Sequence, residues 1–268
     1  MTMTEPRKDP ERSRGAYVDA NGVRTYYEVE GAGEPLVLLH GGLCAIETFE
    51  SLRRALVDRH RVYLPERRGH GRTPDVDGPY SYGLFAEDTI AFMEAVGLPS
   101  AHLVGFSDGA TVGLLVALRR PDLATTLTHI GQPVNLDGIQ PELRDVVKLD
   151  AMPQGMLPPV LRELYEAVSP DGVDHWDVVL DKAWQMMRTE PNLAIADLAA
   201  VTAPTLLIVA DQDIPTVPHA EEMRDALPDG SLVVVPDASH GLPMEKPDVL
   251  ARIVLDFLAE HDAKDQRG

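Results

Sequence analysis

The sequence predicts an α/β fold, in which a mostly parallel sheet of eight strands carries helices on both faces and a helical insertion. Three observations support this prediction. The chain opens with two strand-like runs joined by Asn21 and Gly22, a pair suited to a tight hairpin turn. Strand-like and helix-like segments then alternate, which is typical of parallel strands joined by crossover helices. The alternation stops between residues 132 and 200, where several prolines interrupt amphipathic stretches.

The individual elements are predicted from hydrophobic periodicity. The run Leu-Val-Leu-Leu at 36–39 is continuously apolar, as expected for a strand buried on both faces, and 205–210 is the clearest run of this kind. Strands are expected at 16–19, 23–29, 36–39, 61–64, 101–106, 127–130, 205–210 and 231–235. Helices are expected at 48–59, 82–96, 108–119, 161–168, 176–187, 221–227 and 248–260.

This pattern divides the chain into a core and an insertion. Residues 15–132 and 201–262 are expected to form the core, and residues 133–200 a helical insertion between two sheet strands. Residues 1–14 and 263–268 are rich in charged residues and are expected to be flexible tails.

Composition excludes several classes of function. The chain has 268 residues, 44% of them hydrophobic, and can bury a sizeable core. Its net charge of −19 would repel nucleic acids and anionic membrane surfaces. Cys44 is the single cysteine, so neither an intrachain disulfide nor a cysteine metal cluster is expected. With neither a secretory signal nor a transmembrane run in the sequence, a reduced, cytoplasmic protein is expected.

The segment Gly-Phe-Ser-Asp-Gly at 105–109 predicts a nucleophile. It lies between a predicted buried strand and a predicted helix. A serine on such a sharp turn is exposed for attack, and glycines around it remove side chains that would clash with the tight backbone. Ser107 is therefore the expected nucleophile. The side chain of Asp108 is interpreted as a first-turn carboxylate that favours the helix dipole.

A serine needs a histidine to accept its proton. His240 is the candidate among nine histidines, because it lies in the loop after the strand at 231–235, and such loops hold the reactive groups of a parallel sheet. Six of the other histidines are expected to be exposed to solvent or to pack in the interior. Solvated positions are expected for His60, His175, His219 and His261, and packed positions for His102 and His129.

The acid that orients the histidine is expected after another strand. Asp211 and Asp213 directly follow the strand at 205–210. Asp213 is preferred, since Asp211 is close enough to the strand to cap a turn. Asp137, in the loop after the strand at 127–130, remains a third candidate.

The oxyanion of the reaction needs two backbone N–H donors. One is expected from Asp108, the residue after the nucleophile. The other is expected from the loop His-Gly-Gly at 40–42, where Gly42 can bring its backbone close, with Leu43 as the alternative donor. His40 is expected to brace this loop rather than transfer protons.

Taken together, these segments resemble the α/β-hydrolase superfamily over almost the whole chain, from residue 16 to 258. The matching pieces occur in the family's order. They are the loop at 40–42, Glu-Arg-Arg-Gly-His-Gly-Arg at 66–72, the turn at 105–109, Ala-Asp-Gln-Asp at 210–213, and Ser-His-Gly at 239–241 followed by Glu-Lys-Pro at 245–247. In the family the last residue of the fourth segment is the triad acid, which supports Asp213. The sequence departs from the family pattern at Ala210 and Glu66, where glycine and aspartate are common.

The resemblance implies that the insertion is a lid over the active site. Several apolar lid residues are candidates for lining a pocket there, although most are expected only to pack the lid onto the core. They are Met152, Met156, Leu157, Trp176, Trp184, Met186 and Met187. Leu43, Phe106, Trp184 and Met187 are taken as the substrate-binding residues.

The resemblance also narrows the chemistry. Dehalogenases and epoxide hydrolases of this fold use an aspartate nucleophile, whereas this turn presents Ser107. We expect a serine hydrolase that cleaves an ester or lactone of a small to medium apolar substrate through an acyl-enzyme intermediate. The alternatives are a carbon–carbon bond hydrolase, which would call for a buried arginine such as Arg144, Arg162 or Arg188 in the lid, and a ligand-binding receptor. No cofactor or metal is expected; the partner is a small-molecule substrate, and a homodimer is left open.

Overall fold

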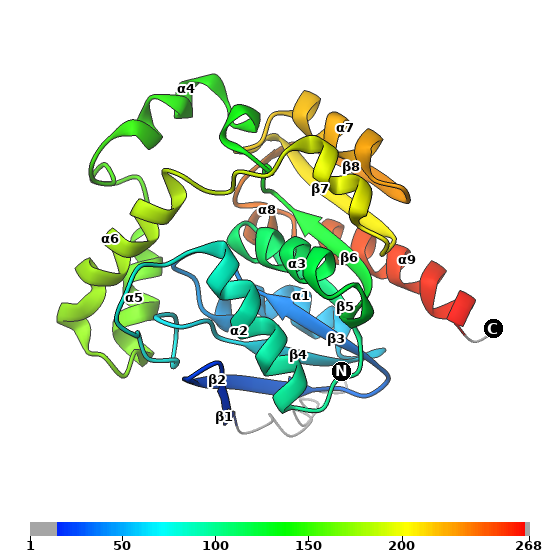
Figure 1. The fold of residues 1–268 in the computed structure, drawn as a ribbon, viewed down its shortest axis with the longest axis horizontal. Coiled ribbons are helices and arrows are strands. Elements are labelled where there is room, and N and C mark those ends of the chain that lie inside the picture. The colour runs from blue at the N-terminus through cyan, green and yellow to red at the C-terminus, as the bar shows by residue number, and fades with distance from the viewer. Residues whose placement is uncertain (1–14, 266–268) are drawn as a thin grey trace, which may run out of the picture.

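A single eight-stranded sheet organises the structure (Figure 1). The computed structural model describes residues 15–265, so the predicted tail at 1–14 lies outside the described residues, as do residues 266–268. The strand order is β1-β2-β4-β3-β5-β6-β7-β8. The strands are β1 (Ala16–Ala20), β2 (Val23–Glu30), β3 (Glu34–Leu39), β4 (His60–Pro65), β5 (Ala101–Phe106), β6 (Ala124–Ile130), β7 (Thr205–Gln212) and β8 (Gly230–Ser239).

The sheet is mostly parallel, as predicted. β1 pairs antiparallel with β2, and β2 antiparallel with β4, while the pairings from β4 through β8 are parallel. Asn21 and Gly22 both have positive φ in the turn between β1 and β2, as a tight hairpin requires. The carboxyl ends of the parallel strands therefore meet at one edge, where the loops after β3, β5, β7 and β8 converge.

Helices cover both faces of this sheet. They are α1 (Glu50–Leu56), α2 (Tyr82–Ala95), α3 (Asp108–Arg119), α4 (Pro141–Arg144), α5 (Pro159–Val168), α6 (Trp176–Met187), α7 (Val217–Ala226), α8 (Leu242–Glu245) and α9 (Pro247–Asp265). Short 3₁₀ turns are η1 (Ile46–Phe49), η2 (Pro121–Leu123), η3 (Leu136–Gly138), η4 (Val146–Lys148), η5 (Val173–His175) and η6 (Ile195–Ala200). Within residues 15–265, no helix is long and apolar enough to cross a membrane.

The two faces form separate apolar cores. Phe85 and Phe92 of α2 and Val112 and Val116 of α3 lie in one core, against one face of the sheet. α1 and α9 contribute to the other core, which buries Leu52 and Leu56 together with a stripe of α9 residues. Burial of apolar surface on both faces explains why the central strands read as continuous apolar runs.

The chain between β6 and β7 leaves the sheet and carries α4, α5 and α6 (Figure 1). We call residues 133–200 the inserted segment. Its two ends are joined to each other, because Leu193 N–H donates to the Val134 carbonyl at 2.9 Å and Asn135 Nδ2 donates to the Leu193 carbonyl at 3.0 Å. It is joined to the loop after β7 as well, where Gln140 N–H donates to the Ile214 carbonyl at 2.9 Å.

Element ends differ from the sequence prediction where capping decides them. α7 begins at Val217 rather than 221, because the Thr216 hydroxyl accepts a hydrogen bond from His219 N–H and caps the helix. The helix predicted at 48–59 begins as η1 and ends at Leu56, since His60 already pairs with Glu34 in the sheet. α9 continues to Asp265, into the predicted C-terminal tail.

Candidate active site

Ser107 lies on a strained turn between β5 and α3. Its φ is +53°, in the left-handed region that few side chains adopt without glycine's freedom. The turn is tight enough to require its glycines. A Cβ on Gly105 would lie 2.2 Å from the Gly109 carbonyl oxygen, and one on Gly109 would lie 2.1 Å from the Leu39 carbonyl oxygen. The sequence folds this way locally because only glycine fits at both positions.

Three of the predicted site residues form one hydrogen-bonded chain. His240 Nε2 lies 3.0 Å from Ser107 Oγ, and His240 Nδ1 lies 2.7 Å from Asp213 Oδ1. They come from the loops after β5, β7 and β8, which meet at the carboxyl edge of the sheet. The Asp213 side chain is 1% exposed and that of His240 is 29% exposed. This is the geometry in which a histidine can take a proton from a serine while a buried carboxylate orients its ring.

The structure separates the three candidate acids. Asp213 Oδ1 also accepts Ile214 N–H at 2.8 Å, and Asp213 Oδ2 accepts Ala210 N–H at 3.1 Å. Asp211 is exposed and accepts the backbone N–H groups of residues 237 and 238, and these hydrogen bonds lower its pKa. Asp137 has an exposed side chain in η3. Of the three, only Asp213 is brought to His240.

The predicted oxyanion loop lies against the residue that follows the nucleophile. A Cβ on Gly42 would be 2.4 Å from Asp108 Oδ2 and 2.7 Å from Met187 Cε, so only glycine fits between them. Asp108 is the first residue of α3, where the leading N–H groups lack acceptors inside the helix. Leu43, the alternative donor, has a φ of +55°, so the backbone of this loop is turned sharply.

Two buried side chains brace this loop. His40 Nδ1 bonds the Gly41 carbonyl at 2.8 Å, and His40 Nε2 accepts the Arg67 N–H at 3.1 Å. Burial, helped by the Arg67 charge, holds the pKa of His40 well below its usual range. The Arg67 guanidinium donates to the carbonyls of His40 and Gly41. With one nitrogen donating and one accepting, His40 is a neutral brace.

The sequence interpretation missed the environment of the Asp108 side chain. The side chain does lie in the first turn of α3, as predicted, but it is only 2% exposed. Asp108 Oδ1 accepts the Tyr82 hydroxyl at 2.6 Å, while Oδ2 has no hydrogen-bond partner among the described residues. Burial raises the pKa of Asp108, although the nearby Arg67 charge opposes the rise. No signal inside the segment 105–109 distinguishes a buried carboxylate from a solvated one, because its neighbours Tyr82 and Arg67 come from other parts of the chain.

The four predicted substrate-binding residues differ in how close they lie to Ser107, His240 and the loop at 40–42. Phe106 stacks on the His240 ring, with centroids 5.0 Å apart. Met187 lies against Gly42, as its distance from a Gly42 Cβ shows. Trp184 is 2% exposed, and its indole N–H donates to the Leu149 carbonyl at 3.0 Å, so here it packs the inserted segment. Leu43 lines a pocket under that segment.

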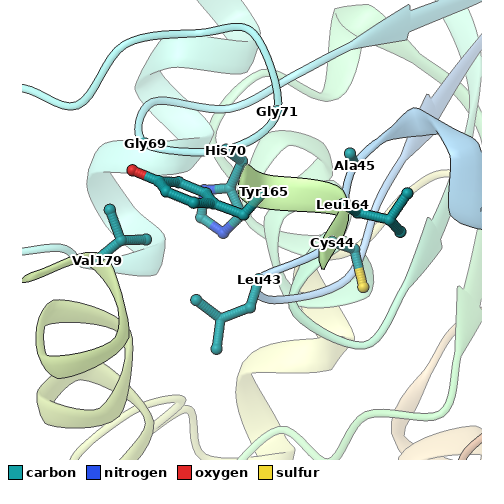
Figure 2. Close-up of a pocket in the computed structure, with 9 residues that line it drawn as sticks. All are labelled: Leu43, Cys44, Ala45, Gly69, His70, Gly71, Leu164, Tyr165 and Val179. Atoms are coloured by element: carbon teal, nitrogen blue, oxygen red, sulfur yellow. The ribbon is translucent and has the colours of Figure 1, made fainter. Parts of the chain in front are cut away.

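This pocket lies between the oxyanion loop and the helices of the inserted segment (Figure 2). Leu164 and Tyr165 of α5 and Val179 of α6 meet Leu43 and His70 there (Figure 2). The pocket has no room for a water molecule in this conformation.

Further contacts hold the inserted segment down. Asp75 Oδ2, in the loop before α2, accepts Lys182 Nζ at 2.6 Å and bonds His175 Nε2 at 2.8 Å. The inserted segment is therefore closed over the oxyanion loop.

Two further residue assignments change once the structure is known. His219 is buried rather than solvated, and its Nε2 accepts Val134 N–H at 3.2 Å. His60 is buried as well. Cys44 is a free, buried thiol whose pKa burial raises to about 11, so it is a poor nucleophile.

Comparisons with known proteins agree with this geometry. The family model described as "Alpha/beta hydrolase family" matches residues 36–253. A 2-hydroxymuconate semialdehyde hydrolase of Pseudomonas sp. strain CF600 is 29% identical, with 97% of this chain and 99% of the relative covered. A protein of Azorhizobium caulinodans that is provisionally named a carbamate hydrolase is 26% identical, with 92% and 99% covered. The enol-lactonase of Burkholderia xenovorans LB400 is similar in structure, with a TM-score of 0.72, 22% identity, and 91% and 100% covered.

Proposed function

Because the chain belongs to the alpha/beta hydrolase family, whose model matches residues 36–253, we propose that it is a serine hydrolase acting through an acyl-enzyme. The substrate is an ester or lactone of a small to medium apolar molecule. One observation carries the proposal: Ser107 Oγ, the His240 ring and the Asp213 carboxylate lie in a chain of 3.0 and 2.7 Å contacts on a strained strand-to-helix turn.

In the acylation step, Ser107 Oγ attacks the carbonyl carbon while His240 Nε2 takes the hydroxyl proton. The N–H groups of Gly42 and Asp108 stabilise the oxyanion that forms. His240 then returns the proton to the departing oxygen as the ester bond breaks. In the second half, His240 takes a proton from water while the hydroxide attacks the acyl-enzyme. His240 then gives this proton to Ser107 Oγ as the acyl–oxygen bond breaks, which releases the acid and restores Ser107. Buried Asp213 stabilises the imidazolium in both halves.

The inserted segment is proposed to be the lid that selects substrates. Its helices close the pocket above Leu43, and Met187 lies against Gly42, where an acyl group would have to pass. Apolar and adaptable lining of this kind favours an apolar acyl chain over a charged one.

A carbon–carbon bond hydrolase is the second candidate, and the similarity to known proteins favours it. A 2-hydroxymuconate semialdehyde hydrolase is among the relatives that are 29% identical to this chain. In this chain the inserted segment also borders an open cavity of about 610 Å³ that is lined by Arg144, Lys148, Arg188 and Asp137. Arg144 and Lys148 are exposed and Arg188 is half-buried and pairs with Asp150, so none of them is the buried arginine that this candidate calls for. Arg162 is not part of it and pairs with Glu166 on the surface of α5.

Activity-based labelling tests the shared chemistry first. A fluorophosphonate probe should label Ser107 alone, as mass spectrometry of the labelled peptide will show, and Ser107→Ala should remain unlabelled. Folded protein with unlabelled Ser107 would overturn the proposal in favour of a ligand-binding role.

A substrate panel then separates the two candidates. Esters of increasing acyl length, lactones and a vinylogous diketone acid are offered to the same preparation, with Ser107→Ala as the control. Turnover of esters or lactones above the diketone acid supports the first candidate, and the reverse order supports the second.

A further inference from the structure

Three polar side chains lie together at the edge of the sheet opposite the catalytic residues. His60 is the first residue of β4 and His102 the second residue of β5, so both lie at the amino ends of parallel strands. Asp262 lies near the end of α9. One potential ligand atom from each of the three falls within 4.8 Å of the other two.

The sequence pattern itself brings these side chains together. His60 alternates with Val62 and Leu64 along β4, so it faces the same core as they do. On α9, Asp262 continues a stripe of residues four apart that packs onto this face of the sheet. The stripe consists of Leu250, Val254 and Leu258. A carboxylate is thus held at the end of an apolar stripe, directly over two imidazoles.

The distances within the cluster suit a small cation. His60 Nε2 lies 3.3 Å from Asp262 Oδ2, and His102 Nε2 lies 3.0 Å from Asp262 Oδ1. Ligand atoms bound tetrahedrally at about 2.0–2.1 Å from a zinc ion are about 3.3 Å apart. Both histidine–carboxylate separations are close to this value, one to each oxygen of Asp262, and the three potential ligand atoms lie within 4.8 Å of one another.

Hydrogen bonding does not account for the position of His60. His60 is 1% exposed, yet both its ring nitrogens lack a hydrogen-bond partner among the described residues. Asp262 Oδ1 lies 3.0 Å from His102 Nε2, a separation that a hydrogen bond also gives, so the unsatisfied ring of His60 is the observation that a bound ion would explain. Buried ring nitrogens are almost always satisfied, and unsatisfied ones call for an explanation.

His102 is oriented as a metal ligand would be. Its Nδ1 bonds the Thr126 hydroxyl at 2.9 Å, which leaves Nε2 facing Asp262. Metal-binding histidines typically donate their second ring N–H to such an outer partner.

We propose that His60, His102 and Asp262 bind a divalent transition-metal ion of the zinc class. Two imidazoles and one carboxylate, without a thiolate, form a ligand set suited to zinc and its neighbours. Solvent supplies the fourth position, on the side where Asp262 is 28% exposed. The ion fastens α9 to β4 and β5 and has a structural role, since the catalytic residues lie at the other edge of the sheet. The proposed site differs from the sequence-based expectation of no metal. The sequence did not reveal it because its ligands come from three elements far apart along the chain.

Zinc binding to the untagged full-length chain tests the proposal. Metal-free protein is incubated with Zn²⁺, passed over a desalting column and analysed by inductively coupled plasma mass spectrometry. We expect one zinc per chain. At free zinc about 100 times its dissociation constant, Tm should rise by on the order of 5 °C.

Matched variants locate the ion. Asp262→Asn keeps the shape of the side chain but removes its charge, and should abolish both zinc retention and the rise in Tm. Asp256→Asn makes the same change at an exposed position of α9 and should retain both. The metal-free melting temperatures of the two variants verify that each is folded. Cobalt(II) substitution gives a second readout, since a tetrahedral site shows intense visible absorption that Asp262→Asn should lose.

Two outcomes would overturn the proposal. Wild-type protein that retains no zinc and shows no rise in Tm would mean that the cluster is only a pair of histidine–aspartate contacts. Zinc retained equally by Asp262→Asn would place the ion elsewhere, for example at His240 and Asp213.

Discussion

Replacing Asp213 by asparagine should remove most turnover, for a reason visible in its hydrogen bonds. Asp213 Oδ1 is shared by His240 Nδ1 and Ile214 N–H, and Oδ2 accepts Ala210 N–H. An asparagine must place its NH₂ group on one of these two sides. On the first side it faces His240 Nδ1 as a donor, which forces the ring proton onto Nε2, where it blocks transfer from Ser107. On the second side the NH₂ group faces the Ala210 N–H, so that two donors meet and neither has an acceptor.

The expected loss of kcat follows from these two orientations. The first imposes the wrong tautomer on His240, and both remove the negative charge beside it. The wrong histidine tautomer and the loss of the charge that stabilises the imidazolium together cost a serine hydrolase about 10⁴-fold in kcat. That factor corresponds to about 5.4 kcal/mol of transition-state stabilisation. The opposed donors at Asp213 add a loss of folding stability of about 1–3 kcal/mol, because a buried N–H is left unsatisfied.

The neighbouring Asp211→Asn is the matched control. Asp211 is exposed, caps the turn at residues 237 and 238, and is not among the contacts of His240. We expect kcat within about tenfold of wild type and a small drop in Tm. The assay is kcat for an activated ester, with thermal unfolding measured on the same preparations. If Asp213→Asn stays within about tenfold of wild type, or Asp211→Asn loses about 10³-fold or more, the assignment of the acid is wrong.

Two further changes test the loops around the site. Burial raises the pKa of Glu66 to about 7. Between pH 4.5 and 7 the Glu66 carboxyl is therefore ionised in the unfolded chain but protonated in the native protein, and the native protein loses stability as the pH rises through this range. Relative to wild type, Glu66→Gln should therefore gain up to about 3 kcal/mol in the free energy of unfolding between pH 4.5 and 8, as urea titrations will measure; parallel pH profiles would contradict this. Met187→Ala should shift KM among acyl lengths while kcat for a small ester changes little, whereas Met156→Ala, at an exposed position, should change neither. Uniform loss on every substrate would instead assign Met187 to folding.

The sequence predicted the sheet and its strand elements well because their cause is local. Continuous apolar runs at 36–39 and 205–210 follow from burial on both faces, and the hairpin follows from Asn21 and Gly22. Helix ends were less predictable where a side-chain cap decided them, as Thr216 does for α7. The limits of the inserted segment stay a prediction.

The residues of the candidate site could be predicted where a place directly after a strand determines where the side chain lies. Ser107, Asp213 and His240 each follow a strand, and the parallel topology brings such positions to one edge. The environments of Asp108 and His60 were not predictable. Their burial depends on Tyr82 in one case and on α9 in the other, and no local pattern encodes contacts between segments so far apart in the chain.

The joined ends of the inserted segment have a consequence for how this architecture can diversify. Because Val134 and Leu193 are hydrogen-bonded to each other, and Gln140 is bonded to the chain just after Asp213, the chain leaves and re-enters the core at one fixed doorway. We therefore expect that residues 141–191 can be exchanged as a cassette while the hydrogen bonds at their two ends are kept. A new cassette would change which molecules are admitted, while the proton-transfer machinery beneath it is inherited without adjustment. If the proposed function holds, substrate range and catalytic chemistry are encoded in separate stretches of one chain.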